Sequence, residues 1–105
     1  MDLDLESGRK IHQATEDDIL AYVEGEDFAI LSQDEDSYMQ CAEQHEPPYE
    51  YLLEYQDRSI EQHYRATDEP ISLDRVLSAF LKYKRGDESW REDFQWEKMD
   101  LSQGG

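Results

Sequence analysis

The sequence predicts an α+β fold, with an antiparallel sheet of about four to six strands and two helices packed on one face of the sheet. Two segments show the apolar period of a helix, at residues 15–25 and 72–86. Between them lie short β-rich runs with alternating side chains, separated by turn residues. Because the helices do not alternate with single strands along the chain, an antiparallel sheet covered on one side is favoured.

The N-terminal residues 1–10 are polar and without a clear period, so we expect a loose terminus, or a short edge strand reaching Ile11. A first helix is expected to begin at Thr15, whose hydroxyl can cap it, and to end at Gly25. The acids that follow Thr15 suit the positive end of the helix dipole. The apolar stripe of this helix is Ile19, Leu20, Tyr22 and Val23.

Strands are expected over residues 28–31 and 37–43, followed by a β-hairpin over residues 49–66 at the middle of the sheet. The hairpin turn, residues 56–59, lacks the glycine that tight turns favour. Either Arg58 adopts a left-handed conformation, at a cost of roughly 1 kcal/mol, or the loop is wider than two residues.

The second helix has the full amphipathic pattern, with Ser72 as its cap and Gly86 as its end. Its apolar positions are Leu73, Val76, Leu77, Phe80 and Leu81. Beyond it, Ser89 is expected to cap a single turn, and a last strand should run from about Phe94 to Leu101. Residues 1–105 thus form one domain, with residues 102–105 as a second loose terminus.

Charge is the dominant feature of the composition. Ten Lys and Arg face 27 Asp and Glu, for a formal net charge of −17. Such a chain repels phosphates and anionic lipid, so we expect a basic protein partner, with no direct binding to nucleic acid or membrane. The alternative is that the acids only keep a small protein soluble. The N-terminus does not resemble a signal peptide, and a single cysteine, Cys41, fits a reducing cytoplasm.

The sequence carries no phosphate-binding loop, nucleophile elbow, cysteine pair or helical histidine pair. Glu61 and His63 would share a strand face, which permits an acid–base or metal pair, but a solvated strand face is the commoner outcome. Cys41 is expected to be a packing group rather than a nucleophile. We therefore expect no enzyme activity, no metal and no cofactor.

Aromatic residues of the hairpin offer a candidate contact surface. If the tyrosine stripe faces away from the helices, it can bind a basic, partly apolar partner; if it faces inward, the opposite face, with its carboxylates, His63 and Arg65, takes that role. Trp90 and Trp96 can close the core or anchor an interface. The candidate partner-binding residues are Tyr49, Glu50, Tyr51, Glu54, Tyr55, Glu61, His63, Tyr64 and Trp90.

Several short motifs together resemble the small acidic immunity proteins of bacterial polymorphic-toxin and contact-dependent inhibition systems. They are Tyr51-Leu52-Leu53-Glu54-Tyr55 with His63-Tyr64, Phe80-Leu81-Lys82-Tyr83, Gly86-Asp87 with Ser89-Trp90, and Phe94 with Trp96-Glu97. The resemblance covers about residues 15–101. It implies a cytoplasmic, non-enzymatic α+β protein that binds one cognate toxin domain and blocks it. Many such toxins are basic nucleases, which a charge of −17 would complement.

Two other functions remain open at this point. One is an acidic adaptor or DNA-mimic module that occupies the nucleic-acid-binding sites of basic proteins. The other is a small enzyme or metal binder built on His63 and Glu61, which lacks every further motif.

Overall fold

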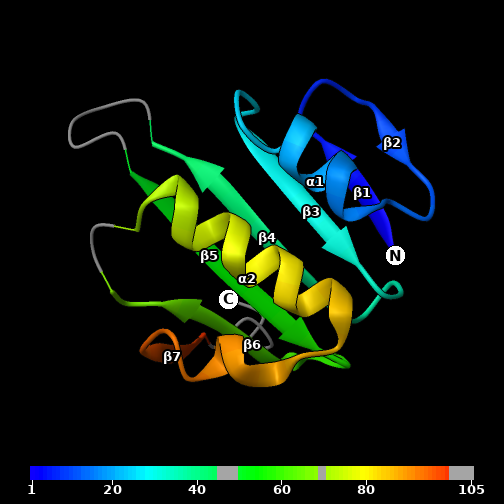
Figure 1. The fold of residues 1–105 in the computed structure, drawn as a ribbon. Helices are drawn as coiled ribbons and strands as arrows, with labels where there is room; N and C mark the ends of the chain where they lie inside the picture. The colour runs from blue at the N-terminus through cyan, green and yellow to red at the C-terminus, as the bar shows by residue number, and fades with distance from the viewer. Residues whose placement is uncertain (45–49, 69–70, 100–105) are drawn as a thin grey trace.

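The computed structural model describes residues 1–44, 50–68 and 71–99. These residues form a seven-stranded antiparallel sheet, two α-helices and one 3₁₀-helix (Figure 1). The α+β class and the antiparallel sheet are therefore confirmed, while the expected four to six strands were too few.

The sheet has the strand order β2-β1-β3-β4-β5-β6-β7. The strands are β1 Asp2–Leu5, β2 Lys10–Ile11, β3 Phe28–Ser32, β4 Tyr38–Glu43, β5 Tyr51–Asp57, β6 Ser59–Ala66 and β7 Trp96–Met99. The helices are α1 Glu16–Tyr22, α2 Leu73–Arg85 and η1 Glu88–Arg91. The last strand is thus shorter than expected in its described part, and residues 102–105 lie outside the described residues.

The additional strands come from the N-terminus, which is not loose. β1 pairs with β2 on one side and with β3 on the other, and its Leu3 and Leu5 are buried. The Ser7-Gly8 break is the turn that joins β1 to β2, where Gly8 has φ 92° and donates its N–H to the Leu5 carbonyl. The apolar–acidic alternation of residues 2–5 is therefore the signature of a strand with one buried face.

The helix boundaries follow the capping chemistry that the sequence predicts. Thr15 forms a capping box with Asp18, and Ser72 accepts from the Arg75 N–H at the start of α2. Gly86 ends α2 in a left-handed conformation. The expected cap at Ser89 is wrong: Asp87 caps η1, and its carboxylate accepts from the Ser89 N–H.

The β5–β6 hairpin turns at Arg58 alone. Arg58 has φ 72°, and the register shifts between Gln56 and Asp57. The left-handed alternative for Arg58 is thus the one found. The Arg58 N–H donates to Ser37 Oγ over 3.0 Å, which ties the turn to the end of β4.

One hydrophobic core joins a single face of the sheet to the helices. In Figure 1, α1 lies in front of β1 and β3, and α2 in front of β4 and β5. The core contains Ile19 and Val23 from α1 and its flank, Val76 and Phe80 from α2, and inward side chains from the strands. Of the helices in the described part of the chain, none has the length and hydropathy to cross a membrane.

Candidate partner-binding surface

The tyrosine stripe faces the helices. Tyr51 and Tyr55 retain only 8% and 5% of their exposure, and Tyr64 stacks on Tyr55 with a ring-centroid distance of 5.0 Å. Burial raises the pKa of both Tyr51 and Tyr55. Tyr49 lies outside the described residues. The rings of Tyr51 and Tyr55 thus stabilise the core and are not exposed to a partner.

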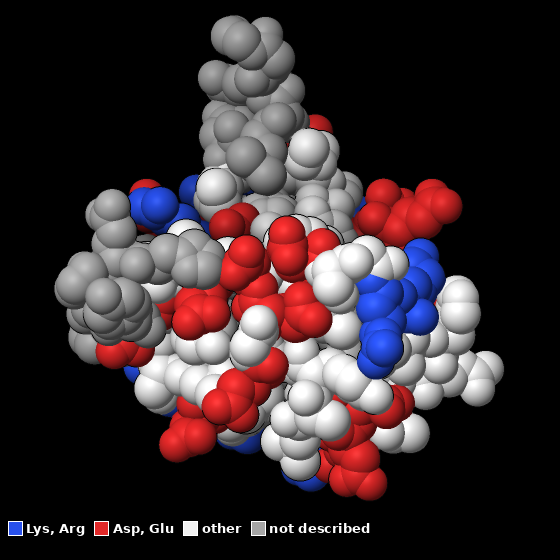
Figure 2. Space-filling view, turned by 90° about the horizontal axis from the view of Figure 1, so that it is seen from above, with Lys and Arg blue, Asp and Glu red and all other residues white. Residues whose placement is uncertain are grey.

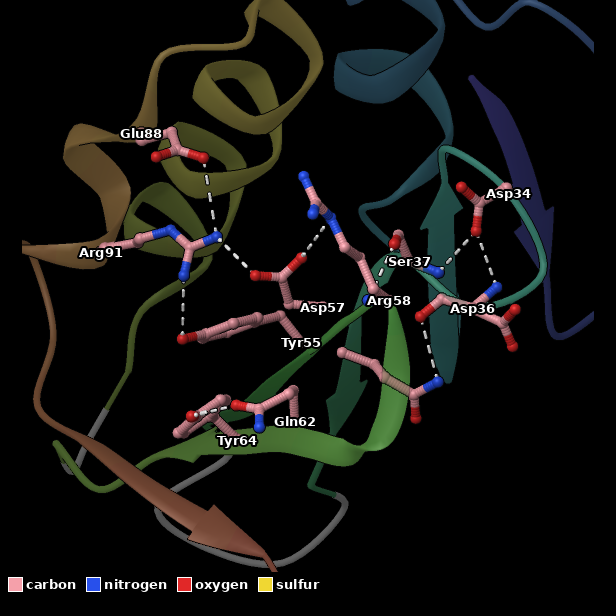
Figure 3. Close-up of polar contacts among 11 residues, drawn as sticks. Asp34, Asp36, Ser37, Tyr55, Asp57, Arg58, Gln62, Tyr64, Glu88 and Arg91 are labelled. Atoms are coloured by element: carbon pink, nitrogen blue, oxygen red, sulfur yellow. Dashed lines mark hydrogen bonds and ion pairs between the residues drawn. The ribbon is translucent and has the colours of Figure 1, made fainter.

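Trp90 is also a core residue. It is 2% exposed and packs edge-to-face on Tyr55 and Tyr83. The Arg91 guanidinium lies over the Trp90 ring at 4.8 Å. In Figure 3, Arg91 reaches the Tyr55 hydroxyl, the Asp57 carboxylate and Glu88. Trp90 therefore closes the core near the β5–β6 turn and offers no ring to a partner.

The opposite side of the sheet, called here the open face, is the other candidate surface. The cross-strand register brings Ile30, Gln40 and Glu54 into one row, and Ser32, Tyr38 and Gln56 into the next. None of the described helices covers this side in Figure 1. The open face comprises Asp4, Phe28, Ile30, Ser32, Tyr38, Gln40, Ala42, Leu52, Glu54, Gln56, His63, Arg65 and Glu97.

The His63 side chain is buried within the open face and is not exposed on its surface. It is 2% exposed; its Nε2 lies 2.7 Å from Glu54 Oε1 and its Nδ1 lies 3.1 Å from Gln56 Oε1. Gln56 Nε2 donates to the Asp36 carbonyl, and the Tyr38 hydroxyl donates to Gln56 Oε1. Both ring nitrogens of His63 therefore have protein partners, as a buried polar group requires.

Glu61, the expected neighbour of His63, is exposed and does not join this network. Within the described ranges, no three or more His, Cys, Asp or Glu side chains lie close enough to hold a metal ion. Burial raises the pKa of Cys41 to about 12, so its thiol is a poor nucleophile near neutral pH. The arrangement around His63 is thus suited to packing and hydrogen bonding.

Charges on the open face are largely paired. Lys10 lies 3.6 Å from Asp4, and Arg65 lies 3.2 Å from Glu97. Glu54, half-buried, is paired with His63 and also accepts from Gln40 Nε2. Asp4 and Glu97 on this face are thus each matched by a nearby cation, although the chain carries −17.

Two hollows of about 300 and 330 Å³ lie on either side of Leu52 and Glu54. The first is lined by Phe28, Ile30, Gln40, Cys41, Ala42, Leu52 and Glu54. The second is lined by Leu52, Leu53, Glu54, Arg65, Ala66, Thr67 and Met99. Leu52 is therefore a ridge between two concave areas.

Acidic residues gather at one end of the sheet. The Glu6 N–H donates to the Phe28 carbonyl, Ser7 donates to Glu26, and the Glu43 N–H donates to the Asp27 carbonyl. Figure 2 looks onto this end and shows acidic side chains across the middle of the surface. We call Glu6, Glu24, Glu26, Asp27 and Glu43 the acidic edge; the Glu43 and Glu24 charges add to burial in raising the pKa of Tyr51. Glu50 lies beside it, since its carbonyl accepts from the Gln44 N–H.

Comparison of the chain with protein-family models, curated proteins and solved structures finds no match. Of the predicted partner-binding residues, the structure leaves Glu50, Glu54, Glu61 and Tyr64 at least partly accessible. The sequence analysis missed Phe28 and Leu52, which are 40% and 42% exposed. Leu52 alternates with the inward Tyr51 and Leu53, so the period of β5 could have placed it on the open face.

Proposed function

We propose that this protein is a cytoplasmic inhibitor of the immunity-protein type, which binds and neutralises a cognate basic toxin domain. The observation that carries the proposal is the surplus of acid on a small folded domain with one accessible sheet face. Even if each of the ten Lys and Arg neutralised one carboxylate, 27 − 10 = 17 acids would remain uncompensated. Such a surface attracts a basic partner and accelerates its association.

The distribution of the acid supports a protein partner in particular. Glu6 of the acidic edge lies opposite Phe28, and Glu50 lies two residues before Leu52, so carboxylates and apolar groups are available to the same partner. Interfaces between proteins commonly combine an apolar centre with a charged rim. A module that only mimicked nucleic acid would rely on charge alone.

The test uses the protein encoded by the gene immediately upstream, whose C-terminal domain is the candidate toxin under this proposal. Calorimetry should give tight binding to that domain that weakens as salt is raised, and co-expression should restore growth of cells producing the toxin. A tight complex with that domain and none with unrelated basic proteins supports an immunity protein. Equal binding to many basic DNA-binding proteins would instead indicate the acidic adaptor or DNA mimic.

A matched pair of variants separates the acidic edge from charge in general. Glu26→Gln with Glu43→Gln removes two charges from the acidic edge, and Asp17→Asn with Glu35→Gln removes two exposed charges elsewhere. The first variant should slow association several-fold more than the second. Equal effects would show that net charge, and not its placement, governs binding.

A further inference from the structure

We propose that the open face binds a polypeptide segment in which an apolar side chain is flanked by Lys or Arg. The docking site is a patch of four residues, Phe28, Ile30, Ala42 and Leu52, called here the apolar patch. The inference rests on the proposed basic partner and assigns to it the part of the surface that it contacts.

The patch is continuous across three strands. Phe28 is paired with Ala42, and Ala42 is paired with Leu52, so these side chains form one row on the open face. Ile30 lies two residues along β3 from Phe28 and shares the same hollow of about 300 Å³. Single exposed apolar residues are ordinary on protein surfaces, but a contiguous group beside a hollow indicates a contact site.

Other exposed apolar residues differ from the patch in their setting. Leu20 and Tyr22 lie on α1, and Ile60 lies near the start of β6. None of the three lines the hollows on either side of Leu52. Leu20, at 48% exposure, is therefore a suitable control for Leu52, at 42%.

Charge specifies the occupant. The acidic edge borders the patch through Glu6, which lies opposite Phe28 because its N–H donates to the Phe28 carbonyl. Glu50 lies two residues before Leu52, so strand alternation places it on the same side of the sheet as Leu52. A second copy of this chain would bring two acidic edges together, which like-charge repulsion disfavours. A segment with basic residues flanking an apolar one satisfies both the patch and its rim. Its apolar side chain would enter the hollow beside Leu52.

The test uses a synthetic peptide, acetyl-KRLFLRK-amide, and a control with the same charge, acetyl-KRSSSRK-amide. Titration of the full chain, followed by amide chemical shifts, should place the KRLFLRK response on Phe28, Ile30 and Leu52. We expect KRLFLRK to bind about tenfold more tightly than KRSSSRK, because burial of apolar side chains adds to a charge attraction common to both. Leu52→Ser should remove most of this difference, while Leu20→Ser should preserve it.

Equal affinity for the two peptides, a response centred on the helices, no detectable binding at millimolar peptide, or equal effects of Leu52→Ser and Leu20→Ser would each overturn the inference. An unchanged unfolding midpoint in both variants verifies that the fold is intact. The proposed function is judged separately, by binding to the upstream-encoded domain. If that domain binds wild type and Leu52→Ser equally, the inhibitor proposal stands and the patch is refuted. If the peptide binds the patch but the domain does not bind, the patch stands and the inhibitor proposal fails.

Discussion

Arg58 joins β5 to β6 in a backbone conformation that suits arginine poorly. Its φ of 72° lies in the left-handed region, where a residue with a Cβ is disfavoured by about 1–2 kcal/mol. Its side chain is 92% exposed and approaches Asp57 only to 3.9 Å. An ion pair so exposed contributes little to stability, so a substitution here acts mainly through the backbone. Figure 3 shows how the turn is held by Ser37.

We predict that Arg58→Gly is more stable than Arg58→Ala. Glycine relieves the left-handed strain, but the unfolded chain has more conformational freedom with glycine than with alanine. This entropy cost of folding cancels about 0.5–1 kcal/mol of the gain from relief of strain. The expected difference between the variants is thus about 0.5–1 kcal/mol in favour of glycine. Alanine is the matched control because it removes the same side chain and retains the Cβ. Asparagine, which tolerates this region, should fall between them.

Urea unfolding followed by tryptophan fluorescence measures this difference, since Trp90 is buried in the folded protein. In a thermal scan, about 1 kcal/mol corresponds to a shift of roughly 4 °C for a domain of this size. Equal stability of the glycine and alanine variants, or a less stable glycine variant, would refute the account of strain at this turn.

Three further predictions concern stability. Burial raises the pKa of Cys41 to about 12, so the stability that the neutral thiol contributes is fully present below the unfolded pKa of about 8.5 and is lost as the pH rises above it. Between about pH 8 and pH 10, the free energy of unfolding of the wild type should fall by about 2 kcal/mol relative to that of Cys41→Ala, as urea unfolding at each pH will measure. Thr15→Ala should cost about 1 kcal/mol because it removes the cap of α1, whereas Thr15→Ser should retain most of it, as unfolding midpoints will show. Trp90→Ala should cost about 3–5 kcal/mol and weaken the near-ultraviolet circular dichroism, and a loss below about 1 kcal/mol would contradict its place in the core.

Local signals in the sequence determined much of the fold. Helix α2 begins at Ser72 and ends at Gly86 because a hydroxyl cap and a glycine satisfy the ends of a helix locally. The left-handed conformation of Arg58 was one of two alternatives that the sequence left open, and the structure shows it to be the right one. These features depend on neighbours within a few residues, which the sequence displays directly.

The place of β1 was harder to foresee because its partners lie elsewhere in the chain. β1 pairs with β3, and Leu3 lies opposite Leu31, a residue separated from it by the whole of α1. Four residues give a weak period, and Gly8 interrupts it. A hairpin turn requires the same kind of break. Whether Gly8 marks the end of a loose segment or the turn of a hairpin therefore depends on whether a third strand is available to complete the sheet.

The orientation of the tyrosines illustrates a different difficulty. On β5 the period of two separates Tyr51, Leu53 and Tyr55 from Leu52 and Glu54, but it does not say which set meets the helices. In the structure, the volume to be filled decides which set of β5 side chains faces the helices. The space among β5, α2 and η1 is filled by Tyr55, Trp90 and neighbouring rings in edge-to-face contact. A single leucine and a carboxylate could not fill it.

The outward placement of Leu52 and Glu54 also explains why net charge alone is a poor guide to the docking surface. A total of −17 suggests an evenly acidic protein, yet on the open face Lys10 and Arg65 pair with Asp4 and Glu97, and Glu54 is hydrogen-bonded to His63. Because Glu6 and Glu50 lie beside Phe28 and Leu52, a basic partner meets the field of these carboxylates next to the apolar patch. A partner guided by that field would arrive with its cations at the acidic edge and its apolar side chain over Leu52. Placement of charge, which only the fold determines, would therefore fix the orientation of binding as well as its rate.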